Sequence, residues 1–194
     1  MDFSCITGDD EEEIIALTLK HLTDGSYVEN CMRQQFSSGK YLGVKATENG
    51  ELAGYLTFKE GIDFTYPHPE LAEEAEKEAK GRKVFTGDAI YVNPKYRNRG
   101  LGGKLTAMAR DIMLENGGYY FLGEMWIYPD GMIPAYSPSK IYGEYEYEKK
   151  VPMFYKDNKK YGLTCPICGE ECKCGALISL IRLVPGKGTE DENK

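Results

Sequence analysis

Histidine, basic charge and long hydrophobic runs are all scarce in this sequence, and each shortage excludes a class of function. The chain has only two histidines, His21 and His68, among 194 residues, so hydrolysis by a cysteine–histidine pair has little support. Lys and Arg number 24 against 31 Asp and Glu, which gives a formal net charge of -7 and disfavours binding to nucleic-acid phosphates. A cationic or neutral substrate is therefore expected.

Membrane and export signals are absent as well. No apolar run approaches the roughly 20 residues that cross a bilayer, and the acidic start MDFSCITGDDEEE lacks the basic and apolar regions of a signal peptide. We therefore expect a cytoplasmic protein without membrane contact. The hydrophobic content of 41% is enough for a sizeable core, so we predict one domain over 1–185 and a disordered polar tail over 186–194, in a monomer or a homodimer.

Apolar periodicity predicts an alternation of helices and strands. In the first half it indicates helices over 9–23 and after Gly25, then two antiparallel strands around Asn49-Gly50, and a surface helix in HPELAEEAEKEAK. In the second half it predicts a strand over 84–93, a helix from Gly100, a strand in YYFLGEMWIY, a loop or lid after Pro129, a short helix over 153–161 and a last strand in ALISLIRLV. The pattern is that of an α/β fold.

The stretch YRNRGLGGKL, from Tyr96 to Leu105, places three glycines between a strand and a helix. Such a turn is a general anion site, because free amides and the helix dipole both point outward at a helix start. The nucleotide P-loop is excluded, since Leu105 follows Lys104 where Ser or Thr is required. The dinucleotide fingerprint is excluded because Leu105 replaces its third glycine. An ordinary connection with solvated arginines is the alternative interpretation.

The longer segment VNPKYRNRGLGGKLTAMARDIML resembles the coenzyme A-binding segment of the GNAT acetyltransferase superfamily. The family pattern is Arg or Gln, two residues, Gly, one residue, then Gly or Ala, and Arg97, Gly100 and Gly102 meet it. The resemblance implies an α/β fold with a mixed, mostly antiparallel sheet flanked by helices, and acetyl-CoA as cosubstrate. It also implies that the strand pairs with the pantetheine arm while the turn holds the pyrophosphate. The implied cofactor-binding residues are Tyr91, Val92, Arg97, Asn98, Arg99, Gly100, Leu101, Gly102, Gly103 and Lys104.

Acetyl transfer to an amine requires a base for the amine proton and an acid for the departing thiolate. Members of the family commonly place a carboxylate on the strand before the turn. Asp88 is the first candidate base, because it lies four residues before Val92 and should share its strand face, and Glu124 is the second. For the acid, the segment FYKDNKKYGL is similar to the tyrosine context of the family, which favours Tyr155, with Tyr142 as its rival.

A tyrosine-rich segment from Tyr128 to Tyr147 is expected where this fold has its substrate-shaping loops. Its aromatic faces and interspersed glutamates suit a cation, and a dimer contact is the alternative.

Four of the six cysteines fall within CPICGEECKCG. Cys165, Cys168, Cys172 and Cys174 have the spacing of a compact metal knuckle, for which tetrahedral zinc is the first expectation, with an iron–sulfur cluster or reactive thiols as alternatives. Four cysteine ligands leave no open coordination position, so the zinc should be structural and clamp the hairpin of the last two strands. Cys5 and Cys31 are interpreted as core thiols.

The sequence therefore predicts an acetyl-CoA-dependent N-acetyltransferase. Its acceptor is expected to be an amine of a small molecule, a polyamine or a protein, with direct transfer in a ternary complex. The competing hypothesis is a non-catalytic or coenzyme A-sensing module that engages a protein partner through the zinc knuckle and the tyrosine-rich segment.

Overall fold

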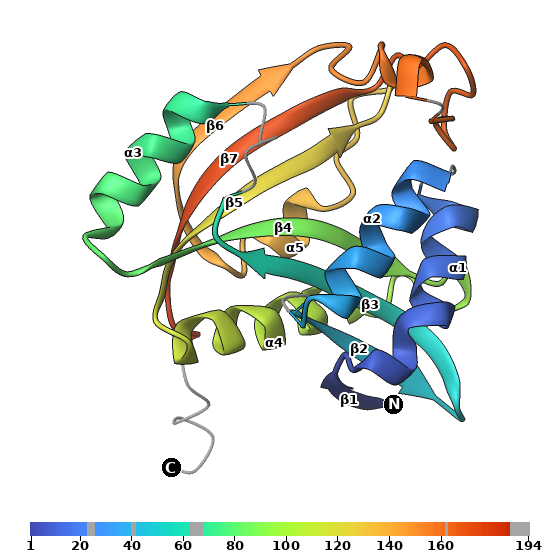
Figure 1. The fold of residues 1–194 in the computed structure, drawn as a ribbon, viewed down its shortest axis with the longest axis horizontal. Helices are drawn as coiled ribbons and strands as arrows, with labels where there is room; N and C mark the ends of the chain where they lie inside the picture. Colours follow the sequence, from blue (N-terminus) through green and yellow to red (C-terminus); the bar gives the residue numbers. More distant parts are fainter. Residues whose placement is uncertain (23–25, 40–41, 63–67, 162, 187–194) are drawn as a thin grey trace.

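The computed structural model describes residues 1–22, 26–39, 42–62, 68–161 and 163–186, and there the chain forms one mixed sheet with helices on both faces (Figure 1). The expected tail falls largely on 187–194, outside the described residues. The strand order is β1-β2-β3-β4-β5-β7-β6. The strands are β1 (Asp2–Cys5), β2 (Leu42–Glu48), β3 (Glu51–Glu60), β4 (Lys83–Val92), β5 (Gly118–Ile127), β6 (Gly143–Val151) and β7 (Gly175–Leu183).

The helices lie between the strands in the order that the sequence predicts. They are α1 (Glu11–His21), α2 (Ser26–Ser37), α3 (Pro69–Ala79), α4 (Leu101–Glu115) and the short α5 (Tyr136–Ser139), with 3-10 turns η1 (Gly8–Asp10), η2 (Pro94–Tyr96) and η3 (Asn158–Tyr161). No helix of the described residues is long and apolar enough to cross a membrane. The predicted α/β fold with a mostly antiparallel sheet is confirmed.

The sheet separates at its centre. All neighbouring strands pair antiparallel except β4 and β5, which run parallel from Lys83 opposite Gly118 to Thr86 opposite Leu122. Beyond Thr86, β4 continues against β3 alone among the described residues, while β5 continues against β7 to Ile127. The two central strands therefore diverge toward their carboxyl ends, as Figure 1 shows.

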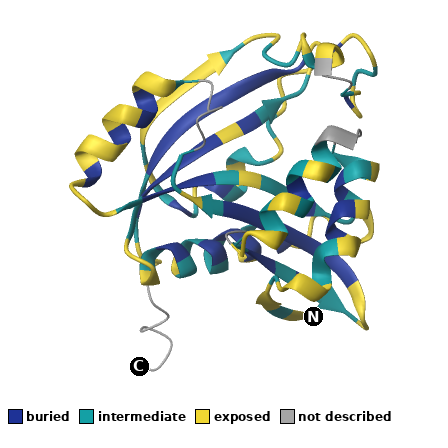
Figure 2. Ribbon diagram, in the orientation of Figure 1, coloured by how far each residue is buried: buried dark blue, intermediate teal, exposed yellow. Residues whose placement is uncertain are grey.

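Three apolar clusters cover the sheet. Helix α4 packs on one face through Leu105, Ala109 and Met113, none of which has exposed surface. The other face carries α3 over β5 and β7, and α1 with α2 over β3 and β4. Strand β7 is buried along nearly its whole length (Figure 2), because it lies between β5 and β6 and beneath helices.

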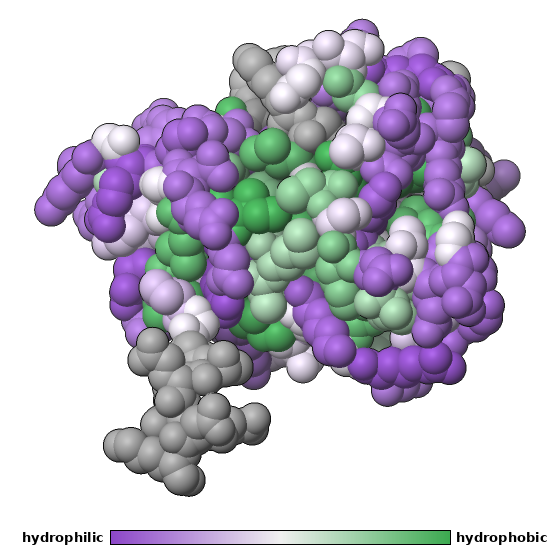
Figure 3. Space-filling view, turned by 90° about the horizontal axis from the view of Figure 1, so that it is seen from below, coloured by the Kyte–Doolittle hydropathy of each residue, from purple (hydrophilic) through white to green (hydrophobic). Residues whose placement is uncertain are grey.

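The helix-covered face at α4 is not wholly buried. Helix α4 carries half-buried apolar side chains, among them Met108 and Ile112. The view from below shows a hydrophobic area across the middle of this side of the molecule, bordered by hydrophilic side chains (Figure 3).

The hairpin between β2 and β3 forms at the predicted turn. Asn49 and Gly50 both adopt positive φ, at 54° and 79°, which is the conformation of a two-residue turn that matches strand twist. The predicted surface helix is also present as α3, whose narrow seam of Leu71, Ala72 and Ala75 faces the sheet.

Two expectations for the second half are wrong. The segment after Pro129 is not a loop throughout, because Gly143–Val151 forms the edge strand β6. The segment GEYEYEKKV alternates tyrosine with glutamate, which is the period of a strand, and most of it is exposed because β6 lies at the edge of the sheet. The short helix expected over 153–161 reduces to turns and η3.

The two isolated cysteines differ from each other. Cys5 is exposed on β1 at the outer edge of the sheet, so its interpretation as a core thiol is wrong. Cys31 is half-buried on α2.

Candidate active site

The turn between β4 and α4 is held in place by contacts to the start of β3. Asn93 caps η2 by accepting a hydrogen bond from the Lys95 N–H at 3.1 Å. The buried Tyr96 donates from its hydroxyl to Glu51 at 3.1 Å, and the Lys95 ammonium pairs with the same carboxylate at 2.7 Å. The turn is therefore anchored before the glycines begin.

Left-handed backbone shapes the entry to α4. Asn98 has φ of 60°, and Gly100, the residue before the helix, has φ of 73° and ψ of 8°. A Cβ disfavours this conformation, which explains Gly100 without any ligand. The first turn of α4 contains no acidic residue, so its outward-facing amides keep their attraction for an anion.

The third glycine of the turn permits close packing of the segment around α5. A Cβ at Gly103 would lie 3.0 Å from Ile141 Cδ1, which is a tight contact, whereas a Cβ at Gly102 would make an ordinary contact with Pro138 Cγ at 3.4 Å. Packing therefore accounts for Gly103 but not for Gly102.

The basic side chains of the turn take different directions. The Arg97 Nε donates to the Val92 carbonyl at 3.0 Å, so this arginine braces the end of β4. The Arg99 guanidinium carbon lies 5.7 Å from the centre of the Tyr96 ring. Lys104 is exposed on the first turn of α4. Together they place positive charge around the helix start.

The end of β4 presents backbone groups toward β5. The Asn93 N–H donates to the Ala53 carbonyl at 2.9 Å, which sets the alternation of the β3–β4 ladder. In an antiparallel ladder the residues between bonded pairs direct their N–H and C=O groups to the opposite edge. The amides of Ile90 and Val92 therefore face the gap where β4 and β5 have separated.

Tyr91 is directed away from the gap. Its backbone groups belong to the ladder with β3, where it is opposite Tyr55. The residue is 3% exposed, and its ring stacks on His21 with centroids 5.1 Å apart and lies 5.7 Å from the Tyr55 ring, under α1 and α2.

A cleft of about 90 Å³ occupies the gap between β4 and β5. Residues of β3, β4, β5, α4 and the α5 segment line it, and they include three of the four candidate catalytic residues, Asp88, Glu124 and Tyr142. Thr57, Thr106 and Ser139 also line it. The sequence gives no signal for these three, because they come together only through pairing of distant strands.

Asp88 lies at a β-bulge. Thr57 is opposite Ala89 and Phe58 is opposite Gly87, so Asp88 is the extra residue of β4. The Thr57 hydroxyl donates to the Asp88 carboxylate at 3.1 Å and accepts from the Ala89 N–H at 3.1 Å. The bulge interrupts the alternation of side chains, so the expectation that Asp88 shares the face of Val92 is wrong. Its carboxylate is directed to the α1–α2 face with Thr57.

Glu124 and Tyr155 meet although 31 residues separate them. The Tyr155 hydroxyl donates to Glu124 Oε1 at 2.6 Å. Solvent reaches the Glu124 carboxylate at the mouth of the cleft, yet protein atoms surround most of it, and this burial raises its pKa above the ordinary 4.5. The hydrogen bond from Tyr155 favours the ionised carboxylate and so lowers the Glu124 pKa, but burial has the larger effect. Burial, followed by the neighbouring Glu124 charge, raises the pKa of Tyr155, so its hydroxyl stays protonated.

Tyr142 forms a wall of the cleft on the α4 face. Its ring stacks on Phe121 with centroids 4.0 Å apart, and its side chain is 4% exposed. Burial raises the pKa of its hydroxyl, which therefore remains a proton donor at neutral pH.

A protein-family model matches the greater part of this chain. The model of the acetyltransferase (GNAT) family matches residues 11–136, more than half of the chain. The chain belongs to the GNAT acetyltransferase family. It is an acyltransferase, and the implied fold is confirmed. No curated protein sequence matches it.

Solved structures of other GNAT proteins share this fold at low sequence identity. NAA60 from Arabidopsis thaliana in complex with acetyl-CoA is 13% identical, with a TM-score of 0.65 over 93% of this chain and 97% of that one. The ribosomal-protein-S18-alanine N-acetyltransferase from Escherichia coli is 15% identical, with a TM-score of 0.61 over 97% of each chain. The putative acetyltransferase yncA from Salmonella typhimurium, with its cofactor acetyl-CoA, is 13% identical, with a TM-score of 0.63 over 98% of each.

The cysteine cluster of this GNAT chain forms in the connection between the antiparallel strands β6 and β7. The four Sγ atoms of Cys165, Cys168, Cys172 and Cys174 all lie within 4.8 Å of one another. Cys165 and Gly169 exchange backbone hydrogen bonds of 2.8 and 3.3 Å, which closes the first loop of the knuckle. Three of the thiols are buried and Cys168 is half-buried. This arrangement suits one tetrahedral ion with four sulfur ligands.

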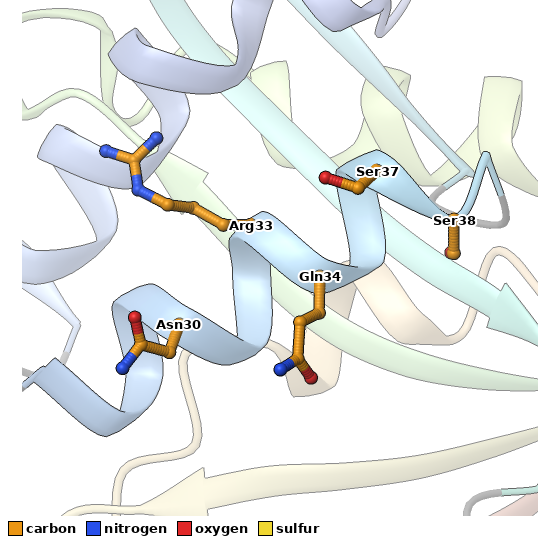
Figure 4. Close-up of a pocket in the computed structure, with 5 residues that line it drawn as sticks. All are labelled: Asn30, Arg33, Gln34, Ser37 and Ser38. Atoms are coloured by element: carbon orange, nitrogen blue, oxygen red, sulfur yellow. The ribbon is translucent and has the colours of Figure 1, made fainter.

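A second, open depression lies on α2 of the acetyltransferase, lined by Asn30, Arg33, Gln34, Ser37 and Ser38 (Figure 4). Arg33 extends to the other side of the helix from Gln34 and pairs with Glu11, Glu12 and Glu29. Three carboxylates therefore more than compensate its single positive charge, and the remaining lining groups are amides and hydroxyls without acid–base function.

Proposed function

We propose that this GNAT chain transfers the acetyl group of acetyl-CoA directly to an amine in a ternary complex. The observation that carries the proposal is the cleft where β4 and β5 separate, which contains the Glu124 carboxylate of raised pKa and reaches α4 at Thr106, in the helix whose start attracts anions. The amine nitrogen attacks the thioester carbonyl carbon, the carbon–sulfur bond breaks, and the thiolate takes a proton.

The cofactor is assigned to the turn and the strand end. The free backbone amides from Gly100 to Gly103 hold the pyrophosphate, and the charges of Arg97, Arg99 and Lys104 add to the attraction. The outward amides of Ile90 and Val92 pair with the pantetheine arm and polarise the thioester carbonyl.

Glu124 is the proposed base. An alkyl amine has a pKa near 10.4 and is mostly protonated at neutral pH, so its proton must be removed before attack. A carboxylate with a raised pKa accepts a proton more readily than an ordinary one, and burial gives Glu124 this property. Asp88 also lines the cleft and is the alternative base.

Tyr142 is the proposed acid. It lines the cleft, whereas the Tyr155 hydroxyl is already donated to Glu124. This assignment reverses the order in which the sequence ranks the two tyrosines.

We further propose that Cys165, Cys168, Cys172 and Cys174 hold one structural Zn²⁺. Support comes from the short mutual distances of the four sulfur atoms and the burial of three of them. Metal analysis by mass spectrometry should find about one zinc per chain, and a charge-transfer absorbance band would instead identify an iron–sulfur cluster.

Calorimetry with acetyl-CoA tests the cofactor site. Gly102→Asp places a negative charge at the helix start, where it repels phosphate but stabilises the helix, so folding should survive. Gly102→Asn is the matched neutral control. We expect the Asp variant, combined with Arg97→Ala, to lose detectable binding, and undiminished affinity would refute the assigned phosphate site.

Thiol release from acetyl-CoA tests catalysis. The acceptors should cover polyamines, aminoglycosides, amino acids and lysine peptides, since the acidic chain and its tyrosines favour cations. Turnover with one class identifies the acceptor. Acetyl-CoA binding without turnover on any amine would favour the non-catalytic binding module.

A further inference from the structure

The cysteine cluster and the candidate base are joined by a single residue. Tyr155 packs against Cys165, Cys172 and Cys174, and its backbone N–H donates to the Cys174 carbonyl at 3.4 Å. At the other end of the same side chain, the hydroxyl donates to Glu124. The path from metal ligand to carboxylate therefore consists of one aromatic side chain.

The segment that carries Tyr155 has little structure of its own. Between Val151 and Gly175 the described residues form turns, the 3-10 turn η3 and an isolated bridge from Cys165 to Gly169. Among the described residues, the knuckle itself contributes cysteines to its apolar cluster, against which Tyr155 packs. Phe154 and Tyr155 also pack against the cluster of α3, β5 and β7, so the sheet holds the start of the connection, and an ion at the four sulfur atoms would supply order to the knuckle.

The ring of Tyr155 is also fixed from the side of the sheet. It meets Trp126 edge to face, with centroids 5.8 Å apart at 76°, and Phe154 with centroids 4.9 Å apart at 84°. Trp126 is the single tryptophan of the chain and lies two residues after Glu124 on β5. A movement of the knuckle that displaces Tyr155 must therefore change the surroundings of this tryptophan.

We infer that the metal-loaded knuckle, Cys165 to Cys174, is a positioning element for the acceptor side of the active site, which acts through Tyr155 on Glu124. This rests on the proposed acetyl transfer and gives the zinc a role in the chemistry without contact to substrate. Tyr155 is then a positioning residue, which keeps the Glu124 carboxylate at the mouth of the cleft. The cofactor turn lies outside this path, because Tyr155 packs on the α3 face of the sheet whereas α4 packs on the opposite face.

Metal removal should affect turnover but not the binding of acetyl-CoA. Removal of the metal should lower kcat by about 10- to 100-fold, the loss expected when a reacting group is displaced by about 1 Å. The KM and the calorimetric Kd for acetyl-CoA should stay unchanged. A knuckle that only stabilises the whole fold would instead impair binding and turnover together.

The decisive experiment compares zinc-loaded and chelator-treated protein, under reducing conditions, in the wild type and in Tyr155→Phe. If zinc acts through the Tyr155 hydroxyl, Tyr155→Phe lowers kcat by itself and metal removal lowers it little further. Tyr119→Phe, at the other end of β5, loses the same atom far from the cleft and should respond to metal removal like the wild type. Equal losses in all three proteins on metal removal would overturn the inference.

Tryptophan fluorescence gives a readout that needs no acceptor. Zinc addition to the metal-free protein should shift or quench the Trp126 emission in the wild type, and Tyr155→Leu, which removes the ring contact, should abolish most of this response. Circular dichroism confirms that the Leu variant is folded. An emission unaffected by zinc, at full zinc occupancy, would overturn the inference even if no amine were acetylated. Loss of acetyl-CoA binding or turnover with an intact zinc response would instead count against the proposed function.

Discussion

In the turn before α4, substitution of Gly100 should lower stability because its backbone is left-handed. Gly100→Ala, which adds one methyl group, tests this expectation. Apart from its two chain neighbours, no described residue has an atom within 4 Å of the position that a Cβ would take, so Gly100→Ala creates no clash with them. Its effect is backbone strain at φ of 73°. Left-handed backbone costs an L-residue about 1–2 kcal/mol, and about 2–4 °C of Tm accompanies each kcal/mol in a domain of this size. We therefore expect the Tm to fall by about 2–8 °C.

Gly102→Ala is the matched control, because it adds the same methyl group two residues later. Gly102 has no positive φ, and its Cβ would make an ordinary contact with Pro138 at 3.4 Å. Alanine is favoured over glycine within helices by up to about 1 kcal/mol, so this variant should match or exceed the wild-type Tm. Gly100→Asn should fall between the two, because asparagine tolerates left-handed backbone.

Thermal unfolding followed by far-ultraviolet circular dichroism measures this difference, with all four proteins at one pH and concentration. Calorimetry with acetyl-CoA should show weaker binding for Gly100→Ala, because the amides of the helix start are displaced, and near wild-type binding for Gly102→Ala. Equal Tm values for Gly100→Ala and the wild type, or a larger loss for Gly102→Ala, would refute the account of the turn.

Further measurements test the base and the core. Glu124→Gln should lower kcat by about 100-fold or more, the usual contribution of a general base, and Asp88→Asn should lower it less; the reverse order in a thiol-release assay would make Asp88 the base. Because burial raises the Glu124 pKa, kcat/KM should fall with acidification already above the ordinary pKa of 4.5. The same shift makes the ionised carboxylate destabilising, a penalty absent below about pH 4.5 and complete once pH has risen through the folded-state pKa. Glu124→Gln should therefore raise the free energy of unfolding at pH 7, but not at pH 4, in urea titrations. Leu105→Ala, at a side chain with no exposed surface, should lower it by about 2–5 kcal/mol.

Local sequence signals predicted most of the fold. The Asn49-Gly50 turn, the helix after Gly100 and the buried strand β7 each follow from patterns within about ten residues, and the structure contains all three. The resemblance of the turn also pointed to the correct family. Strand β6 was not predicted, although its alternation of tyrosine and glutamate has the period of a strand. It lies at the edge of the sheet and is mostly exposed, so it lacks the buried aliphatic residues that mark β7.

The candidate site was only partly predictable for the same reason. Asp88 and Glu124 could be chosen as candidate bases from the strands on which the sequence places them. The bulge that turns Asp88 toward Thr57, however, depends on the register of β3 against β4. The Glu124–Tyr155 bond depends on the path of the chain after β6, where the sequence has no period. Contacts of this kind are set by tertiary packing, which composition and spacing do not encode.

The separation of β4 from β5 has a consequence for the divergence of such proteins. The gap exposes amides of the main chain, and a main-chain amide is present whatever side chain a residue carries, proline excepted. A site built mainly of backbone therefore leaves most of its positions open to replacement during evolution. The fold of this chain is accordingly similar to those of solved acetyltransferases that are only 13–15% identical to it.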